Sequence, residues 1–68
     1  MSKYVLENNN YIVITNDKEA AYEIESCTAI NWYNFNLDDR FYLKDDNELV
    51  VIYVDHELKV IILKIESC

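Results

Sequence analysis

His56 and the paired carboxylates are the residues whose chemistry could support catalysis or metal binding. His56 stands between Asp55 and Glu57, where a histidine could titrate near neutral pH or ligate a metal ion. One histidine with two neighbouring acids is a weak ligand set. General acid–base catalysis by the pairs Asp38–Asp39 or Asp45–Asp46 would need an enclosed pocket that shifts one pKa. The sequence therefore predicts a solvated turn histidine, hydrated turn acids, no catalytic residue, no metal ligand and no cofactor.

The composition argues against several further classes of function. The 68 residues include no glycine and no proline, so glycine-rich phosphate loops, the nucleophile elbow and proline-rich ligand motifs are absent. Thirteen acidic residues against six lysines and arginines give a formal net charge of -7, which disfavours direct binding to nucleic acid or to an anionic membrane. Cys27 and Cys68 form no metal motif. No apolar leader or membrane-spanning run is visible, so a cytoplasmic location is expected.

An aromatic cluster next to an acidic turn is the most informative candidate for a binding surface. Trp32, Tyr33 and Phe35 come before the turn at residues 38–40, and further aromatics follow it. Packing in the core accounts for most such residues. Alternation along residues 31–37 cannot bury all of them, so we expect one or two at the surface beside carboxylates. An exposed aromatic side chain with an acidic rim is typical of a protein-binding hot spot.

The acidic residues suggest what kind of partner such a surface would bind. Solubility alone explains most acidic compositions, but carboxylates gathered on one side could present a negative field to a basic groove, as nucleic-acid phosphates do. In a strand, Glu23 and Glu25 would project from one face about 7 Å apart, at ~3.3 Å per residue. The predicted partner-binding residues are Glu23, Glu25, Trp32, Asp38, Asp39, Asp45 and Asp46.

Two β-hairpins are expected to position these residues. Lys3–Glu7 and Tyr11–Thr15 are β-branched and aromatic runs separated by three asparagines, and Leu49–Val54 and Leu58–Ile65 are two more such runs separated by an acidic turn. Phe41–Lys44 is expected to be a shorter strand. Because the chain has no glycine, turns that need a positive φ must use asparagine or aspartate.

The segment from Asp17 to Asn34 has two interpretations. As a helix, it has an apolar stripe that includes Ala20 and Ile24, with Asn16 as the N-cap. As a strand, it alternates apolar and acidic residues, and Tyr22–Cys27 is similar to Leu63–Cys68. That internal similarity would fit a duplicated hairpin in which the segment pairs with the preceding strand. The strand interpretation is preferred on this ground.

The predicted fold is a single small domain over residues 1–68. It is mainly β, with a small curled antiparallel sheet or a barrel-like meander of hairpins. The alternative is an α+β fold with one helix near residues 17–30 packed on the sheet. The last hairpin is apolar on both faces, so both faces need cover, from curling of the sheet, from a helix or from a second copy in a homodimer. The predicted self-association residues are Leu49, Val51, Tyr53, Val60 and Ile62.

The function expected from the sequence is that of a small acidic protein-binding inhibitor without enzymatic activity. It would occupy a basic or nucleic-acid-binding surface of a larger protein. This description resembles, as a class, the phage or mobile-element proteins that block host defence nucleases, for which the location would be the host-cell cytoplasm. The alternatives are a homo-oligomeric structural or regulatory β-module, and a small-ligand-binding module with a cavity lined by Trp32 and tyrosines.

Overall fold

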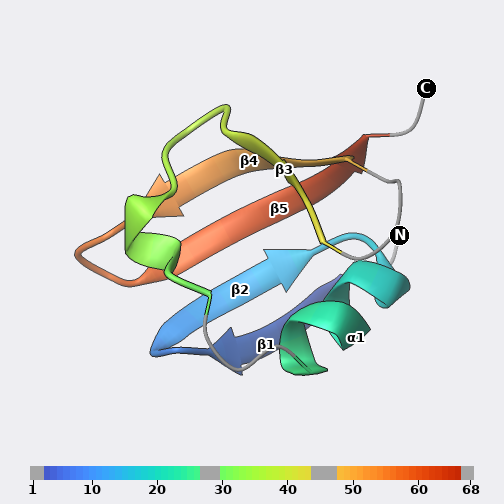
Figure 1. The fold of residues 1–68 in the computed structure, drawn as a ribbon. Helices are drawn as coiled ribbons and strands as arrows, with labels where there is room; N and C mark the ends of the chain where they lie inside the picture. Colours follow the sequence, from blue (N-terminus) through green and yellow to red (C-terminus); the bar gives the residue numbers. More distant parts are fainter. Residues whose placement is uncertain (1–2, 27–29, 44–47, 67–68) are drawn as a thin grey trace.

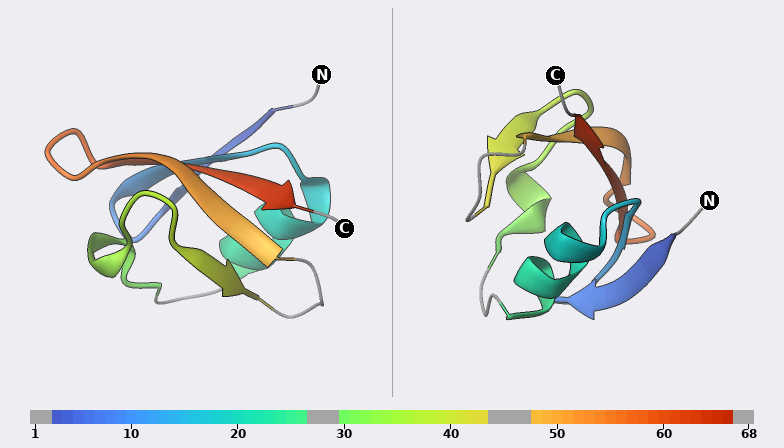
Figure 2. Two further views of the ribbon diagram at one scale, coloured as in Figure 1. Left: turned by 90° about the horizontal axis from the view of Figure 1, so that it is seen from above. Right: turned by 90° about the vertical axis from the view of Figure 1, so that its right-hand side faces the viewer.

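Five strands form one mixed sheet that curves around two short helices (Figures 1 and 2). The computed structural model describes residues 3–26, 30–43 and 48–66. The elements are β1 (Tyr4–Asn8), β2 (Tyr11–Thr15), α1 (Lys18–Ser26), the 3-10 helix η1 (Trp32–Asn34), β3 (Arg40–Tyr42), β4 (Glu48–Asp55) and β5 (Val60–Glu66). None of the helices in these residues is long and apolar enough to cross a membrane.

The strand order is β1-β2-β5-β4-β3, and the sheet is not closed into a barrel. The mainly β prediction is confirmed. One neighbouring pair departs from the expected antiparallel arrangement, because β2 and β5 run parallel, with Val13 opposite Ile61. The chain between these two strands forms the crossover, and it contains α1, η1, β3 and β4.

Both predicted hairpins are confirmed, and their turns use the residues that tolerate a positive φ. Asn9 and Asn10 have φ values of 49° and 71°, which matches a two-residue type I′ turn between β1 and β2. Between β4 and β5, Asp55 pairs with Val60 across a four-residue turn. The Asp55 carboxylate accepts two backbone N–H groups of that turn, and Lys59 supplies its positive φ of 58°. A lysine in this conformation was not expected from the sequence.

The preferred strand interpretation of residues 20–27 is wrong, because α1 occupies most of that segment. The helix begins with Asp17, not Asn16, as its cap: the Ala20 amide donates to Asp17 Oδ2 at 2.9 Å. The Asn16 side chain instead accepts from the Ile65 amide. Ala20 and Ile24, one helical turn apart, are the buried residues of α1. A local cap together with burial of this stripe outweighs the period-two pattern, and no duplicated hairpin forms.

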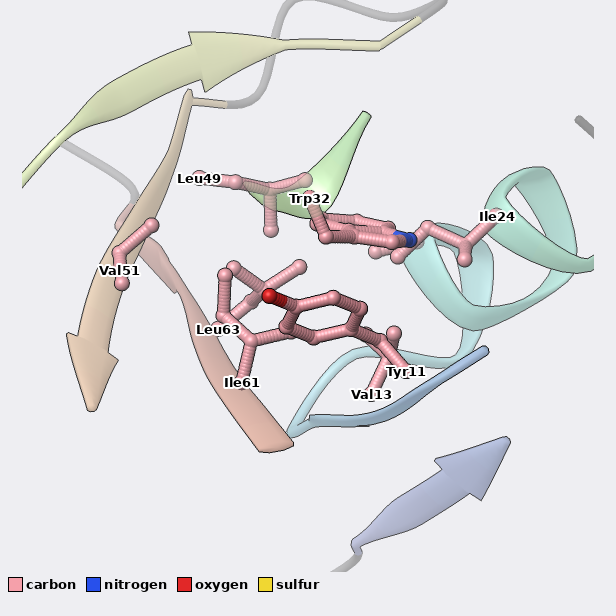
Figure 3. Close-up of a cluster of buried hydrophobic side chains, with 9 residues drawn as sticks. Tyr11, Val13, Ile24, Trp32, Leu49, Val51, Ile61 and Leu63 are labelled. Carbon is pink, nitrogen blue, oxygen red and sulfur yellow. The ribbon is translucent and has the colours of Figure 1, made fainter. Parts of the chain in front are cut away.

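The core lies between the concave face of the sheet and the two helices (Figure 3). Its largest members come from different elements: Ile24 from α1, Trp32 from η1, and Leu49, Ile61 and Leu63 from the two central antiparallel strands. Among the described residues, the buried cluster consists of Tyr11, Val13, Ala20, Ile24, Trp32, Leu49, Val51, Ile61 and Leu63.

A β-bulge in β4 determines which side chains of the last hairpin face outward. Val51 pairs with Leu63 and Tyr53 pairs with Ile62, so Ile52 is the extra residue. Val51 is buried in the core, whereas Ile52 and Tyr53 are both exposed. The bulge therefore places two consecutive large apolar residues on the convex side.

Candidate functional site

His56 connects the turn between β4 and β5 to η1, so the prediction of a solvated turn histidine is wrong. It is half-buried. Its Nε2 lies 2.9 Å from the carbonyl oxygen of Phe35, and its Nδ1 lies 2.5 Å from the hydroxyl of Tyr11. Because a carbonyl can only accept, Nε2 carries the hydrogen and Nδ1 accepts from Tyr11. The imidazole thus fixes the segment after η1 to the end of the sheet.

Aromatic rings pack around the imidazole and complete this contact. The Tyr33 ring lies 5.1 Å from the His56 ring, and the Tyr11 ring lies 5.8 Å from it in an edge-on arrangement. Burial raises the pKa of the Tyr11 hydroxyl, and the neighbouring Tyr33 raises it further. A raised pKa favours the protonated hydroxyl, which is the form that donates to Nδ1 of a neutral imidazole. This arrangement is a structural contact between elements.

Residues 33–38 lie against the β4–β5 hairpin and expose a group of apolar and acidic side chains. The Asp38 amide donates to the Val51 carbonyl at 2.8 Å, and the Val51 amide donates to the Asp39 carbonyl at 2.9 Å. The segment is thus held at Asp38 by β4 and at Phe35 by His56. We define the tip surface as the exposed apolar and acidic residues of this segment and of the adjacent turn, namely Tyr33, Leu37, Asp38, Glu57 and Leu58; Asn34, Asn36 and Lys59 are exposed there as well.

The acids near this end of the molecule divide into structural and exposed groups. Asp39 Oδ2 accepts the Asn36 amide at 2.8 Å, and Asp55 Oδ1 accepts two amides of its own turn. These two carboxylates stabilise turns. Asp38 and Glu57 are exposed, so they are the carboxylates of the tip surface that a partner could reach.

The predicted aromatic anchor, Trp32, is in the core and not at the surface. It is 1% exposed, and its indole donates to Asn8. Tyr33, the next residue, is 66% exposed. Tyr33 therefore meets the expectation that one or two aromatics of this cluster are exposed, and Glu57 follows its ring partner His56 in the chain. No sequence signal marks a three-residue 3-10 helix, and alternation cannot tell which of two adjacent aromatics is inside.

The other predicted partner-binding residues are scattered. Glu23 and Glu25 lie on α1, where residues two positions apart in sequence point about 200° apart around the helix axis. The two glutamates therefore do not share a face. The prediction that they project together is wrong because it assumed a strand. Asp38 and Asp39 lie beside β4 as described above. Asp45 and Asp46 lie outside the described residues.

The predicted self-association residues lie on both faces of the sheet. Leu49 and Val51 are buried in the core beneath the helices, so they cannot contact a second copy. Their assignment is wrong because sequence alternation did not reveal which face α1 and η1 cover. Tyr53 is exposed on the convex face, where register also places Ile62 opposite it and Val60 two residues earlier.

Surface hollows lie at two places in the described part of the chain, and neither of these fits the expected ligand cavity. One, of about 400 Å³, lies between β1 and α1 and is lined by residues such as Leu6, Lys18 and Tyr22. The other, of about 280 Å³, lies on the convex face beside Ile14, Ile52 and Ile62. Trp32 lines neither of them. Within residues 3–26, 30–43 and 48–66, no three histidine, cysteine or acidic residues are grouped to hold a metal ion.

Comparison with protein-family models, with curated proteins and with solved structures found no match. Function is therefore inferred from the chain's own residues and geometry.

Proposed function

We propose that this chain is a protein-binding module without enzymatic activity, and that its tip surface binds a basic surface of a larger protein. The observation that carries the proposal is the exposure of Tyr33, whose segment is fixed to the β4–β5 hairpin by His56. The exposed carboxylate of Glu57 belongs to the same turn as His56. At the other end of the segment, Leu37 and Asp38 again place an exposed apolar side chain next to an exposed carboxylate.

The tip surface has the features of a binding anchor because it is both exposed and held in place. Tyrosine is enriched among residues that dominate binding energy, and a large ring with few rotatable bonds loses little entropy on binding. The hydrogen bonds of His56 and the backbone contacts of Asp38 hold the segment before a partner arrives. Such preorganisation lowers the cost of association.

The charge of the chain favours a basic partner. With a formal net charge of -7, the molecule attracts cationic surfaces at long range and repels acidic ones. In the finer form of the proposal, the partner is a nucleic-acid-binding protein, such as a host defence nuclease. The acidic chain would occupy its basic groove, as an inhibitor encoded by a phage or mobile element would do.

Salt-dependent capture from a bacterial lysate tests this function. The chain is immobilised, exposed to lysate at about 50 mM salt and washed up to about 500 mM, because ionic association weakens as the Debye length shortens. Tyr33→Ala and the double variant Asp38→Asn/Glu57→Gln are compared with the wild type. Tyr22→Ala is the matched control, because Tyr22 on α1 is 69% exposed and lies outside the tip surface.

We expect basic proteins to be retained at low salt and released at high salt. Tyr33→Ala should lower their retention about tenfold or more, as for a binding hot spot, and Tyr22→Ala should not. Duplex DNA added to the lysate should compete for the retained proteins if they use a nucleic-acid-binding groove. Absence of any basic protein at low salt, or equal losses for the two tyrosine variants, would overturn the proposal. Retention that DNA does not affect would overturn the finer form alone.

A further inference from the structure

The sheet has a convex face opposite α1 and η1 (Figure 2). Strand register arranges the apolar and charged residues of this face in separate rows across the strands. Strand register defines a central apolar row, because Val5 pairs with Ile14, Ile14 with Ile62, and Ile62 with Tyr53. These residues come from β1, β2, β5 and β4 in spatial order. Val5 is 64% exposed, and Ile52 in the bulge beside Tyr53 is 48% exposed.

A second row, on one side of the central apolar row, has an acidic residue at each end. Glu7 pairs with Ile12, Ile12 with Val60, and Val60 with Asp55. Each of the four residues lies two positions along its strand from a member of the apolar row. The two rows are therefore about 7 Å apart, since a strand rises ~3.3 Å per residue.

The row on the other side is basic. Lys3 precedes Val5 by two residues and Lys64 follows Ile62 by two, and both lysines line the hollow beside Ile52. Arg40 continues this row on β3, because it pairs with Val50 and Val50 pairs with Lys64. Arg40 is bound to Glu48 and Glu66. Lys3 and Glu7 are exposed and take part in no ion pair within residues 3–26, 30–43 and 48–66.

On β1 this face carries Glu7, Val5 and Lys3 in the order acidic, apolar, basic, which is complementary to the same strand of a second copy. When two copies pack face to face, the two-fold axis lies in the plane of the interface. An axis parallel to the strands would place the acidic row against the acidic row. An axis perpendicular to the strands, along the apolar row, places the acidic row of each copy against the basic row of the other. Only the second arrangement pairs opposite charges.

We propose that the convex face is the interface of a symmetric homodimer, with its two-fold axis along the apolar row. In this dimer Val5, Ile14, Ile52, Tyr53 and Ile62 of both copies form the centre of the interface. Glu7 of one copy faces Lys3 of its partner, and symmetry produces that pair twice. Face-to-face packing of twisted sheets, about 10 Å apart and near −30°, is the common geometry for such a contact.

The size of the face predicts a weak dimer. Four strands at ~4.8 Å spacing and three rows at ~6.6 Å cover roughly 20 Å by 20 Å, which corresponds to a total buried area on the order of 1,000 Å². This is near the lower limit for a specific interface, so dissociation in the micromolar range is expected. The dimer leaves α1 and η1 outside the contact, because they lie on the opposite face (Figure 2).

A charge exchange across the interface tests the proposal. Sedimentation velocity is measured from about 1 to about 500 µM in about 150 mM salt, where the Debye length of ~8 Å screens repulsion between the two acidic molecules. The variants are Lys3→Glu, Glu7→Lys and the double variant that carries both changes. Lys18→Glu and Glu19→Lys on α1 repeat the same changes in charge away from the interface. Ile52→Lys places a charge at its apolar centre, and far-ultraviolet circular dichroism checks that each variant is folded.

We expect a concentration-dependent dimer of the wild type that Ile52→Lys abolishes. Lys3→Glu and Glu7→Lys should each weaken the dimer about tenfold, because each turns two attractive pairs into repulsive ones. The double variant should regain wild-type dissociation, and the two α1 variants should stay within about twofold of it. A wild type that stays monomeric throughout, or a dimer that the double variant fails to restore, would overturn the proposal.

Discussion

Asn8 shows how much of this fold depends on one buried polar side chain. It is 8% exposed at the end of β1. Its Nδ2 donates to the Ile24 carbonyl of α1 at 2.9 Å, and its Oδ1 accepts from Trp32 Nε1 at 2.9 Å. Three elements that are distant in sequence therefore meet on one amide. The same bond holds the indole inside and leaves Tyr33, the next residue of η1, at the surface.

Removal of this amide should be among the most destabilising single changes. Asn8→Ala leaves the buried Trp32 N–H and the Ile24 carbonyl without their Asn8 partner. Each unsatisfied group costs about 1–3 kcal/mol, so we expect a loss of about 2–6 kcal/mol. Trp32→Phe removes only the indole donor and should cost less. Urea unfolding of both single variants and of the double variant measures the coupling between them.

Asn36→Ala is the control for this experiment, because Asn36 is an exposed asparagine. Such surface changes usually stay within about 0.5 kcal/mol. Equal stability of Asn8→Ala and Asn36→Ala, or strictly additive losses for Asn8→Ala and Trp32→Phe, would contradict the assigned network.

At the scale of elements, Arg40 ties the short edge strand β3 to β4 and β5. Its Nη1 lies 3.1 Å from Glu48 Oε1 and 2.5 Å from Glu66 Oε1. Glu48 and Glu66 are opposite each other in the β4–β5 register, where two like charges would repel. The hydrogen bond and charge of Arg40 lower the pKa of Glu66 below its ordinary value.

The lowered pKa gives the contribution of this contact a defined pH dependence. A carboxyl whose folded pKa is depressed adds stability that is fully present above its ordinary value of 4.5 and is lost as pH falls through the folded value. Arg40→Gln should therefore destabilise the protein at pH 7, and the difference from the wild type should shrink below about pH 4 as the Glu66 carboxyl becomes protonated.

Urea midpoints at pH 7, 5 and 3 measure this difference. Lys18→Gln removes one positive charge from exposed α1 and provides the comparison for net charge alone. A difference between Arg40→Gln and the wild type that stays constant with pH would mean that Arg40 acts through packing and not through the two carboxylates.

At the scale of the whole molecule, the excess of negative charge opposes the compact state. The formal net charge is -7, and the longest dimension of the molecule is 32 Å. At about 10 mM salt the Debye length is ~30 Å, so charges interact across the entire molecule. At about 150 mM it falls to ~8 Å, which screens all but neighbouring charges.

Thermal stability should therefore rise with salt. We expect the unfolding midpoint to increase between about 10 and about 200 mM sodium chloride, because screening weakens self-repulsion more in the compact state than in the expanded one. The effect should disappear near the isoelectric point of about 4.4, where net charge vanishes. Parallel scans of Ile52→Lys separate this effect from self-association. An unchanged midpoint at neutral pH would contradict the expectation.

Local chemistry explains which elements could be predicted. The asparagine turn after β1 and the acidic turn after β4 carry both the turn residues and the flanking β-branched runs, so both hairpins were predictable. The apolar pattern of residues 18–26 fits both the helical and the strand period. The N-cap formed by Asp17 and the burial of Ile24 against the sheet stabilise the helix. The parallel pairing of β2 with β5 joins segments almost fifty residues apart, and local sequence carries no signal for it.

Composition and local patterns alone specify an acidic, glycine-free chain that forms β-hairpins and has aromatic residues near an acidic turn. Which aromatic is exposed, and which face of the last hairpin is covered, depend on how elements distant in sequence pack together. The reason is that both faces of β4 and β5 are apolar, so alternation alone cannot select the buried one. The position of α1 and η1 and the bulge at Ile52 select it, burying Val51 and Trp32 while leaving Tyr33, Ile52 and Tyr53 at the surface.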